Sequence, residues 1–338
     1  MSETVLVTGI SGFIAKHCAL KALEAGYSVR GTVRSAARGE AVRETLARHV
    51  DVSRLSFAEC DLLSDAGWDA AVSGCNAVMH LASPFPIIQP KDENELIRPA
   101  VEGTLRVLRV AAANGVKRFV QTSSVVAVMD GQGGAKTRFT EEDWTNVNGP
   151  HVGAYAKSKT LAEKTARDFV AAEAPGMHYA SVNPGFVLGP ALDKDIGSSA
   201  NTIVMIMQGK YPGMPRLHFS CVDVRDVAEA HLKAMQTGQP SGGRYLAVGG
   251  SLWFVEIARA IRQALGDDAK KVPTRELPDF LVKLIGLFDG NARSIVSDLG
   301  KVRDVDNSRT RAALNMTFRP AEEAAVATAR SLVDLGLV

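Results

Sequence analysis

Short runs of apolar, mostly β-branched residues alternate with longer amphipathic segments through the first half of the chain. Such runs are typical of parallel strands buried on both faces, and the segments between them have the length of crossover helices. The pattern therefore predicts a sheet of parallel strands. The predicted strands span residues 4–8, 28–33, 55–59, 77–81, 118–122 and 178–183.

The amphipathic segments between these runs predict helices. They span 13–25, 93–114 and 154–172, and Gly115 is placed to end the second of them. Pro99 lies inside that second segment, where its missing N–H predicts a kink or a restart. The alternation of strands and helices indicates the α/β class, with a doubly wound parallel sheet.

The pattern changes after Pro184. Glycine and proline become frequent, and beyond them one strand at 244–248 and several helices indicate a smaller, mainly helical region. The segment V-D-V-R-D-V-A-E-A-H, at 222–231, predicts a further strand and helix that return to the first sheet. We therefore expect two interleaved units: 1–188 with 222–249, and 189–221 with 250–338.

The composition is that of an ordinary globular protein, with 338 residues, 46% hydrophobic and 22% charged, and a net charge of +2. Lysine and arginine form no basic stripe of the kind that nucleic acid or an anionic membrane requires. No apolar run approaches the roughly 18 residues of a membrane span, and no leader is visible. We expect a cytoplasmic protein, monomer or homodimer, with a small partner molecule. The four scattered cysteines predict buried thiols, no disulfide and no metal site.

The first predicted strand leads directly into T-G-I-S-G-F-I-A, with Gly9, Gly12 and Ala15 spaced by three. Gly9 would allow a tight turn, Gly12 would let the backbone approach a pyrophosphate, and Ala15 would let the helix pack closely on the strand. The helix N-terminus offers amide donors to phosphates. The segment predicts a dinucleotide-binding loop and a Rossmann-type sheet. Further expected contacts in this loop are Ser11, Phe13 and Ile14.

The residues at the end of the second strand favour NADP over NAD. Folds that hold NAD usually carry an acid about 20 residues beyond the glycine loop. Arg34 occupies that strand exit, and Arg30 lies on the same strand face. A guanidinium binds a 2′-phosphate through two charge-assisted hydrogen bonds. Arg38, in the following loop, is a further candidate, and the alternative is a set of solvated arginines at the sheet edge.

Further cofactor contacts are expected where the neighbouring strands end. Asp61 follows the third strand and is placed to accept a hydrogen bond from an adenine amino group. The alternative for this residue is a role in a turn or a helix cap. The expected contacts in this part of the chain are Asp61, Leu62, Leu81, Ala82, Ser83 and Thr122.

Y-A-K-S-K places Tyr155 and Lys159 four residues apart in a predicted helix, so their side chains share one face. A free phenol has a pKa near 10, and a fixed ammonium lowers that pKa. The pair therefore predicts a general acid and its tuning group, although this spacing alone is also common in solvated surface pairs. The run V-Q-T-S-S-V-V adds the hydroxyls of Ser123 and Ser124 at the end of the fifth strand, where open parallel sheets bind ligands.

The chain resembles the extended short-chain dehydrogenase/reductases in five motifs that occur in the order of that family. The motifs are T-G-I-S-G-F-I-A, H-L-A-S-P-F, T-S-S-V-V-A-V-M-D, Y-A-K-S-K-T-L-A-E and V-N-P-G-F-V-L-G-P. Within the family, the chain is similar to the dihydroflavonol reductases, cinnamoyl-CoA reductases and yeast methylglyoxal/isovaleraldehyde reductases. These motifs specify the family and the cofactor class much more closely than the substrate.

The resemblance implies roles for individual residues. Ser124 would bond the substrate carbonyl, Tyr155 would donate a proton, and Lys159 would lower the pKa of Tyr155 and hold the nicotinamide ribose. Pro184 and Val187 would pack beside the nicotinamide. The implied reaction is the reduction of a carbonyl, in which NADPH delivers hydride to carbon while Tyr155 protonates oxygen.

The chain departs from many extended family members at one position. Glu102, in V-E-G-T, stands where those members have the Asn of V-N-G-T. A proton relay through that Asn is therefore not carried over, although dihydroflavonol reductases resemble this chain in having Glu there. His80 and His151 lie near the predicted site, and we expect His80 to be a buried histidine with satisfied hydrogen bonds.

The residues expected near the carbonyl are mainly apolar, which favours a hydrophobic aldehyde or ketone, aryl-substituted ones included. The segment T-I-V-M-I-M-Q, at 202–208, either adds a methionine-rich wall or fills the core, and the core is favoured because methionine fills irregular gaps. The expected substrate contacts are Phe85, Val125, Val126 and Phe186.

Three other functions stay open at this point. A sugar-nucleotide epimerase or dehydratase would use the same Tyr/Lys pair with a tightly held NAD. Such relatives usually carry an Arg shortly before a stretch like V-D-V-R-D, where this chain has Phe219. A nucleotide-sensing regulatory protein of the same fold typically lacks the Tyr or the Lys. Hydroxysteroid dehydrogenation is the third possibility.

Overall fold

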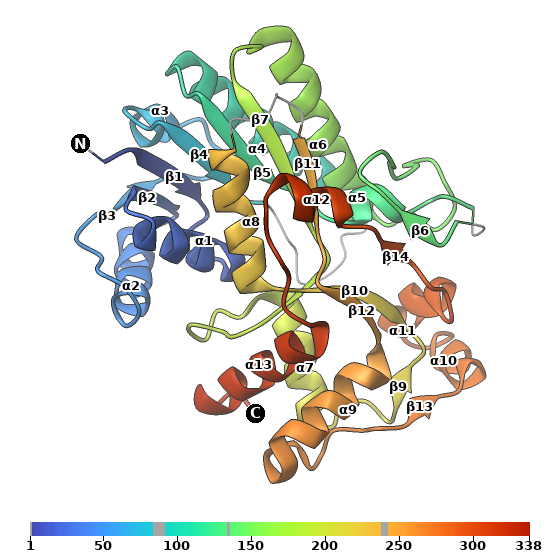
Figure 1. The fold of residues 1–338 in the computed structure, drawn as a ribbon. Helices are drawn as coiled ribbons and strands as arrows, with labels where there is room; N and C mark the ends of the chain where they lie inside the picture. The colour runs from blue at the N-terminus through green and yellow to red at the C-terminus, as the bar shows by residue number, and fades with distance from the viewer. Residues whose placement is uncertain (1, 84–91, 134–135, 238–242) are drawn as a thin grey trace.

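A seven-stranded sheet forms the centre of the molecule (Figure 1), and every neighbouring pair in it is parallel. The computed structural model describes residues 2–83, 92–133, 136–237 and 243–338. The strand order is β11-β7-β5-β4-β1-β2-β3, which confirms the doubly wound α/β class. The strands are β1 (Thr4–Thr8), β2 (Ser28–Val33), β3 (Leu55–Glu59), β4 (Ala77–His80), β5 (Arg118–Thr122), β7 (His178–Pro184) and β11 (Gly243–Ala247).

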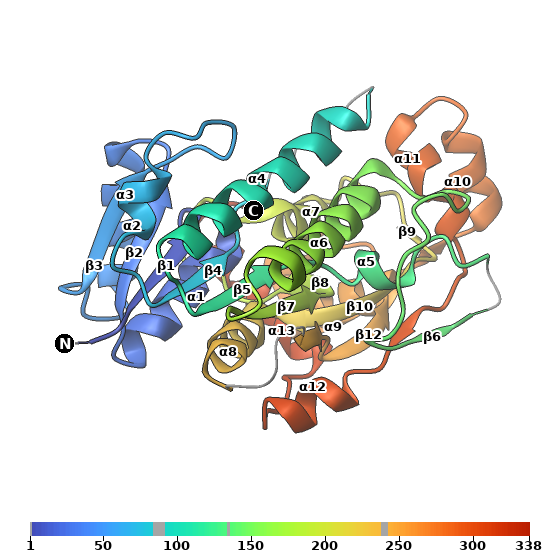
Figure 2. The same ribbon diagram turned by 90° about the horizontal axis from the view of Figure 1, so that it is seen from above.

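Helices cover both faces of this sheet (Figure 2). Along β1, Val5 and Val7 pack with one helical layer and Leu6 packs with the other, as the period of two along a strand requires. Burial on both faces explains why the strands are continuous apolar runs. The first layer holds α1 (Phe13–Glu24), α2 (Ala36–Ala47) and α8 (Val224–Gln236), and the second holds α3 (Trp68–Val72), α4 (Asn94–Ala113) and α6 (Ala154–Glu173).

The three predicted helices are confirmed, with ends that shift by one residue at most. Helix α4 runs through Pro99 as a single helix, so the alternative of a restart at this proline is wrong. Gly115 follows this helix with a φ of +70°, in the left-handed region expected of a residue that ends a helix. Helices α2 and α3 were not predicted, and α2 is polar enough to read as a loop.

A second region lies beyond the carboxyl ends of the central strands. Its three-stranded sheet has the order β12-β10-β8, with β10 parallel to β8 and antiparallel to β12. The strand predicted just before residue 224 therefore joins this small sheet, and only its helix α8 returns to the large one, because β10 pairs with β8 immediately after β7. The elements are β8 (Phe186–Leu188), β10 (His218–Asp223), β12 (Gly250–Trp253), α7 (Gly197–Met207), α9 (Phe254–Leu265) and α13 (Ala321–Asp334).

Shorter elements connect the two regions. Strand β14 pairs with β6, so the chain after residue 300 is tied to the segment before α6, whereas β13 pairs with β9 within the second region. Within the described residues, no helix combines the length and the apolar character needed to cross a membrane.

All four cysteines are free and buried, and burial raises the pKa of each thiol. The short elements are β6 (Arg138–Phe139), β9 (Met214–Pro215), β13 (Glu276–Leu277), β14 (Asp304–Val305), α5 (Val126–Met129), α10 (Asp279–Ile285), α11 (Gly290–Ile295), α12 (Ser308–Ala313) and the 3-10 turns Gly266–Ala269 and Val296–Asp298.

A substitution at Gly31 tests how tightly the sheet packs under the glycine loop. A Cβ added there would stand 2.5 Å from two carbon atoms of Ile10, which is fully buried. Gly31→Ala should therefore lower the free energy of unfolding by about 1–3 kcal/mol, measured by urea denaturation. Gly176→Ala is the control, because nothing lies within 4 Å of its added Cβ. Equal stability of the two variants would show that Ile10 moves aside without loss.

Candidate active site

The loop after β1 has the geometry of a phosphate-binding turn. Gly9 has a φ of +62°, and a Cβ added there would stand 3.1 Å from Ala82, at the end of β4. Gly12 is the N-cap of α1, whose first residue is Phe13. The loop therefore lies tightly against β4 and exposes the first amides of α1 at the strand ends, as a dinucleotide requires.

The three arginines of this end of the sheet lie in different surroundings. Arg34 is exposed at the exit of β2. Arg38 lies on α2, not in a loop, and its guanidinium is 3.6 Å from the carboxylate of Asp195. Arg30 instead donates to the carbonyl of Ser73 at 2.7 Å, beside α3. Arg30 is therefore engaged in the fold, which removes it as a phosphate ligand, whereas Arg34 and Arg38 stay predicted ligands.

The side chain of Asp61 stabilises the turn that follows β3. Its Oδ1 accepts a hydrogen bond from the backbone N–H of Leu63 at 2.8 Å, and its side chain is exposed. This contact is the turn role that the sequence left as an alternative. Leu62 packs against α4 at Gly103, where an added Cβ would stand 3.3 Å from the leucine side chain. Contact of Asp61 and Leu62 with an adenine stays a prediction.

Thr8 fixes the end of β4 beside the glycine loop. Its hydroxyl accepts hydrogen bonds from the N–H groups of Leu81 and Ala82, each at 3.0 Å, and lies 3.0 Å from Nδ1 of His80. Burial, together with the charge of a nearby lysine, lowers the pKa of His80 to about 3. His80 is thus a buried, bonded histidine, as expected. The predicted substrate contact Phe85 lies outside the described residues.

Three predicted catalytic residues come together at the carboxyl end of β5. Ser124 follows β5, and Tyr155 and Lys159 lie one turn apart near the start of α6. The side chains of Ser124 and Tyr155 are hydrogen-bonded to each other. Nζ of Lys159 lies 5.8 Å from the centre of the Tyr155 ring. Two hydroxyls and an ammonium therefore lie in the wall of one cleft.

Burial dominates the electrostatics of this cluster. It raises the pKa of Tyr155, and the hydrogen bond with Ser124 acts in the opposite direction. It lowers the pKa of Lys159 to about 8. The expected net lowering of the Tyr155 pKa is therefore wrong for this geometry, because removing a phenolate from water is more unfavourable than its neighbours can offset.

A cleft of about 280 Å³ joins the glycine loop to this cluster. Gly197, Ser198 and Ser199, at the start of α7, also line it, and no sequence motif indicated them. Predicted cofactor contacts in its wall are Gly9, Gly12, Phe13, Ile14, Leu81, Ser83, Thr122, Tyr155, Lys159, Pro184 and Val187. Among the described residues, predicted contacts outside this wall are Ser11, Arg34, Arg38, Asp61, Leu62 and Ala82.

A second cavity, of about 370 Å³, adjoins the cleft. Val125, Val126 and Phe186 line it, as expected of substrate contacts, together with Phe219. The rings of Phe186 and Phe219 stack with their centres 4.8 Å apart. The residues common to cleft and cavity are Ser124, Tyr155, Gly185, Ser198 and Ser199.

Part of the cavity wall is charged, which the sequence did not indicate. Arg303 lines it and donates to the carboxylates of Asp130 at 2.9 Å and Asp298 at 2.7 Å. Lys301 lies beside them in the same wall. Asp130 and Arg303 are 173 positions apart, so only the fold brings them together.

The other candidate residues lie outside the cluster. Met207 is buried in the core, as favoured for the 202–208 segment, whereas Met205 is half-buried and Thr202 lines the cavity. Glu102 is exposed and pairs with Arg98 at 2.7 Å on the surface of α4. His151 is exposed and has a φ of +60°. Within the described ranges, no three His, Cys, Asp or Glu side chains are grouped as a metal site would need.

Known proteins are similar to this chain in sequence and in fold. The NAD dependent epimerase/dehydratase family matches residues 5–249. The ketoreductase azaE of Aspergillus niger is 32% identical over 94% of each chain, and a cinnamoyl-CoA reductase of Medicago truncatula is 33% identical over 85% of this chain and 91% of its own. The structure of yeast methylglyoxal/isovaleraldehyde reductase Gre2 complexed with NADPH superposes with a TM-score of 0.82 at 26% identity, covering 99% of this chain and all of the other.

The protonation of Lys159 can be measured without any assay of activity. Because burial lowers its pKa to about 8, this amine should titrate well below the value of about 10.4 that is ordinary for a lysine side chain in water. Lysine labelled with ¹³C at Cε would report the titration by NMR, and the signal missing from Lys159→Met would assign it. A midpoint near 10.4 would show that water reaches the ammonium.

Proposed function

Because the chain belongs to the NAD dependent epimerase/dehydratase family, we propose that it is an NADPH-dependent reductase. It converts hydrophobic aldehydes or ketones, aryl-substituted ones included, to alcohols. One observation carries the proposal: the cleft that leads from the glycine loop and the mainly apolar cavity meet at Ser124 and Tyr155. The relatives named as reductases support the type of reaction, and the cavity wall supports the substrate class.

The residues of the cleft fit a dinucleotide. The close approach of Gly9 to Ala82 leaves no room for a side chain in the loop, and the N-terminus of α1 is free to face phosphates. Arg34 and Arg38 would bind a 2′-phosphate that extends past the end of β2. NADPH, when bound, supplies the hydride, and Lys159 would hold its ribose.

The protein contributes orientation and a proton. The hydroxyls of Ser124 and Tyr155 are bonded to each other, so they can donate to one carbonyl oxygen placed between them. Tyr155 then gives up its proton to that oxygen. Lys159, with a pKa of about 8, is mostly charged at pH 7 and stabilises the phenolate left behind.

The cavity favours an apolar substrate over a sugar nucleotide. Phe219, stacked on Phe186, stands where epimerases usually place an Arg that clamps a diphosphate. Arg303, in the same wall, is already paired with two carboxylates. The likeness to MoeE5 in complex with UDP-glucose and NAD, at 18% identity and a TM-score of 0.72, reflects the fold alone.

The two units of the chain have different roles in the proposed reaction. Residues 1–188 and 222–249 bind NADPH, and residues 189–221 and 250–338 shape the substrate site. Phe219 and Arg303 of the second unit line the same cavity as Val125 of the first, which supports this division. We further propose a cytoplasmic protein that acts on small molecules as a monomer or a homodimer.

Removing the Tyr155 hydroxyl tests the proposed chemistry. Tyr155→Phe should lower kcat for an aromatic aldehyde by about 10²–10⁴-fold, because the general acid is lost. Consumption of NADPH is followed by absorbance, and cofactor binding by quenching of protein fluorescence. Tyr211→Phe is the control, since that phenol contacts Met205 outside both the cleft and the cavity. Wild-type turnover in Tyr155→Phe, or turnover of a UDP-sugar with no NADPH consumed, would contradict the proposal.

A charge reversal at Arg34 tests the cofactor assignment. Arg34→Asp should lower kcat/KM for NADPH by about 10–100-fold and leave that for NADH unchanged or raised, because charge-assisted bonds to the 2′-phosphate are lost. Arg309→Asp makes the same change of charge at an exposed arginine paired with Glu142. If Arg34→Asp keeps the full preference for NADPH, the phosphate is bound elsewhere.

A further inference from the structure

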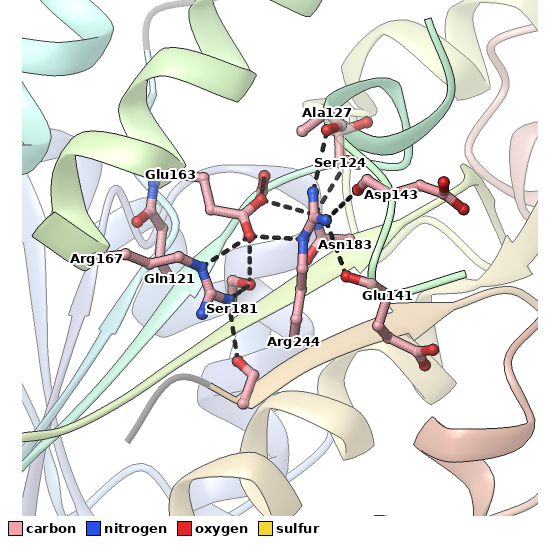
Figure 3. A network of polar contacts seen from close by, with 12 residues as sticks. Gln121, Ser124, Ala127, Glu141, Asp143, Glu163, Arg167, Ser181, Asn183 and Arg244 are labelled. Carbon is pink, nitrogen blue, oxygen red and sulfur yellow. Dashed lines mark hydrogen bonds and ion pairs between the residues drawn. The ribbon is translucent and has the colours of Figure 1, made fainter. Parts of the chain in front are cut away.

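A buried carboxylate lies beneath the candidate site (Figure 3). Glu163, on α6, is fully buried, and donors from three other segments converge on it. Ser123 donates to its Oε2 at 2.6 Å and Asn183 at 2.8 Å, while Ser181 and Arg244 donate to its Oε1 at 2.9 and 2.8 Å. The carboxylate therefore links α6 to the end of β5, to β7 and to β11.

One side of this network leads directly to the serine of the site. Ser123, which bonds Glu163, is the residue before Ser124. The same Nδ2 of Asn183 that donates to Glu163 also donates to the backbone carbonyl of Ser124 at 3.1 Å. Both contacts hold the backbone of Ser124 against α6. The hydroxyl of Ser124 is thereby aimed at Tyr155.

The other side of the network anchors Glu163 itself. Arg244 also donates to the carbonyls of Ala127 and Glu141 at 3.0 and 3.1 Å, and its guanidinium lies 3.7 Å from the centre of the Trp144 ring. Burial alone would raise the pKa of Glu163, but Arg244, Arg167 and the hydrogen bonds outweigh it, so its pKa lies below the ordinary value. Glu163 is therefore a fixed anion whose position is set by β11.

Helix geometry places Glu163 on the face of α6 that carries the chemistry. Tyr155, Lys159 and Glu163 follow one another at intervals of four, so all three point toward the ends of the central strands. A contact between Glu163 and the Ser123 segment consequently sets two things at once: the rotation of α6 and the placement of Ser124.

One buried polar atom of this network has no hydrogen-bond partner among the described residues. Oδ1 of Asn183 is the buried side-chain atom without a hydrogen-bond partner among the described residues. Such an atom is unfavourable in a protein interior. The amide nevertheless points Nδ2 at Glu163 and at Ser124. The orientation of the Asn183 amide therefore keeps the contacts to Glu163 and Ser124, although its own Oδ1 is left without a hydrogen bond in the part of the chain that the structure describes.

The geometry points to Glu163 as a positioning residue that, through Ser123 and Asn183, holds Ser124 in register with Tyr155 on α6. This role rests on the proposed carbonyl reduction. Glu163 touches neither cavity in the described residues and so acts through its neighbours.

Two buried serines provide a matched test. Ser123→Ala and Ser181→Ala each remove one hydroxyl that donates to Glu163, and each leaves the carboxylate with its arginine and other donors. Only Ser123 is joined to Ser124, and Ser123 also lines the cleft, so NADPH binding by Ser123→Ala is measured by fluorescence quenching to separate loss of alignment from loss of a cofactor contact. Ser123→Ala should lower kcat by about tenfold or more through loss of alignment, with KM for NADPH unchanged and a larger isotope effect from NADPH deuterated at C4. Ser181→Ala should keep kcat within about twofold, although within the described residues it loses two hydrogen bonds, one to Glu163 and one from Arg167, where Ser123→Ala loses one.

Readouts independent of turnover accompany the kinetics. The urea midpoint should fall at least as far in Ser181→Ala as in Ser123→Ala, whereas amide hydrogen exchange of the 120–126 segment should rise in Ser123→Ala alone. If both serine variants lose activity in proportion to stability, or if neither does, Glu163 has a structural role only and the inference is wrong. If the wild-type protein fails to consume NADPH with every carbonyl compound tested, the proposed function is wrong. The exchange comparison then still decides whether Ser123 orders this segment.

Discussion

The parallel pairing of the central strands is the constraint on which the candidate site depends. Because all seven strands run in one direction, the carboxyl ends of β1, β2, β4, β5 and β7 share one edge. Gly9, Arg34, Ser124 and Pro184 each lie at or just past one of those ends. Residues far apart in the chain are therefore brought together by backbone pairing, and apolar packing on either face of the sheet supports them all at once.

The same edge also joins the two regions of the molecule. Strand β7 passes through Gly185 into β8, which pairs with β10, so the chain goes from the wall of the cleft to the wall of the cavity within a few residues. The pair of Glu163 and Arg244 ties α6 to the outermost strand beneath this junction. A buried ion pair adds little net stability, because desolvation offsets its attraction. Its contribution here is a fixed distance between helix and sheet.

Patterns within short stretches of the sequence predicted the features that depend only on neighbouring residues. The strands, the turn at Gly9 and the shared helix face of Tyr155 and Lys159 follow from side-chain period, backbone freedom and helix spacing. Contacts between distant segments have no such pattern, which is why the pairing of Arg303 with Asp130 was not foreseen. Arg30 was misassigned because strand period gives the face of a residue but not its hydrogen-bond partners. The pKa of Tyr155 was misjudged because spacing shows a neighbour and not the depth of burial.

The electrostatics of the cluster suit one direction of reaction. Tyr155, half-buried and with a raised pKa, keeps its proton at neutral pH, which is the form needed to protonate an oxygen. The oxygen of a carbonyl that has accepted hydride is a much stronger base than a phenolate, so a raised phenol pKa does not hinder that transfer. Oxidation of an alcohol would require the phenolate, and burial disfavours it. Lys159 is mostly charged below pH 8 and lowers the energy of the phenolate only once it forms. The desolvation that contradicted the simple expectation for Tyr155 thus keeps the phenol in the protonated form that carbonyl reduction needs.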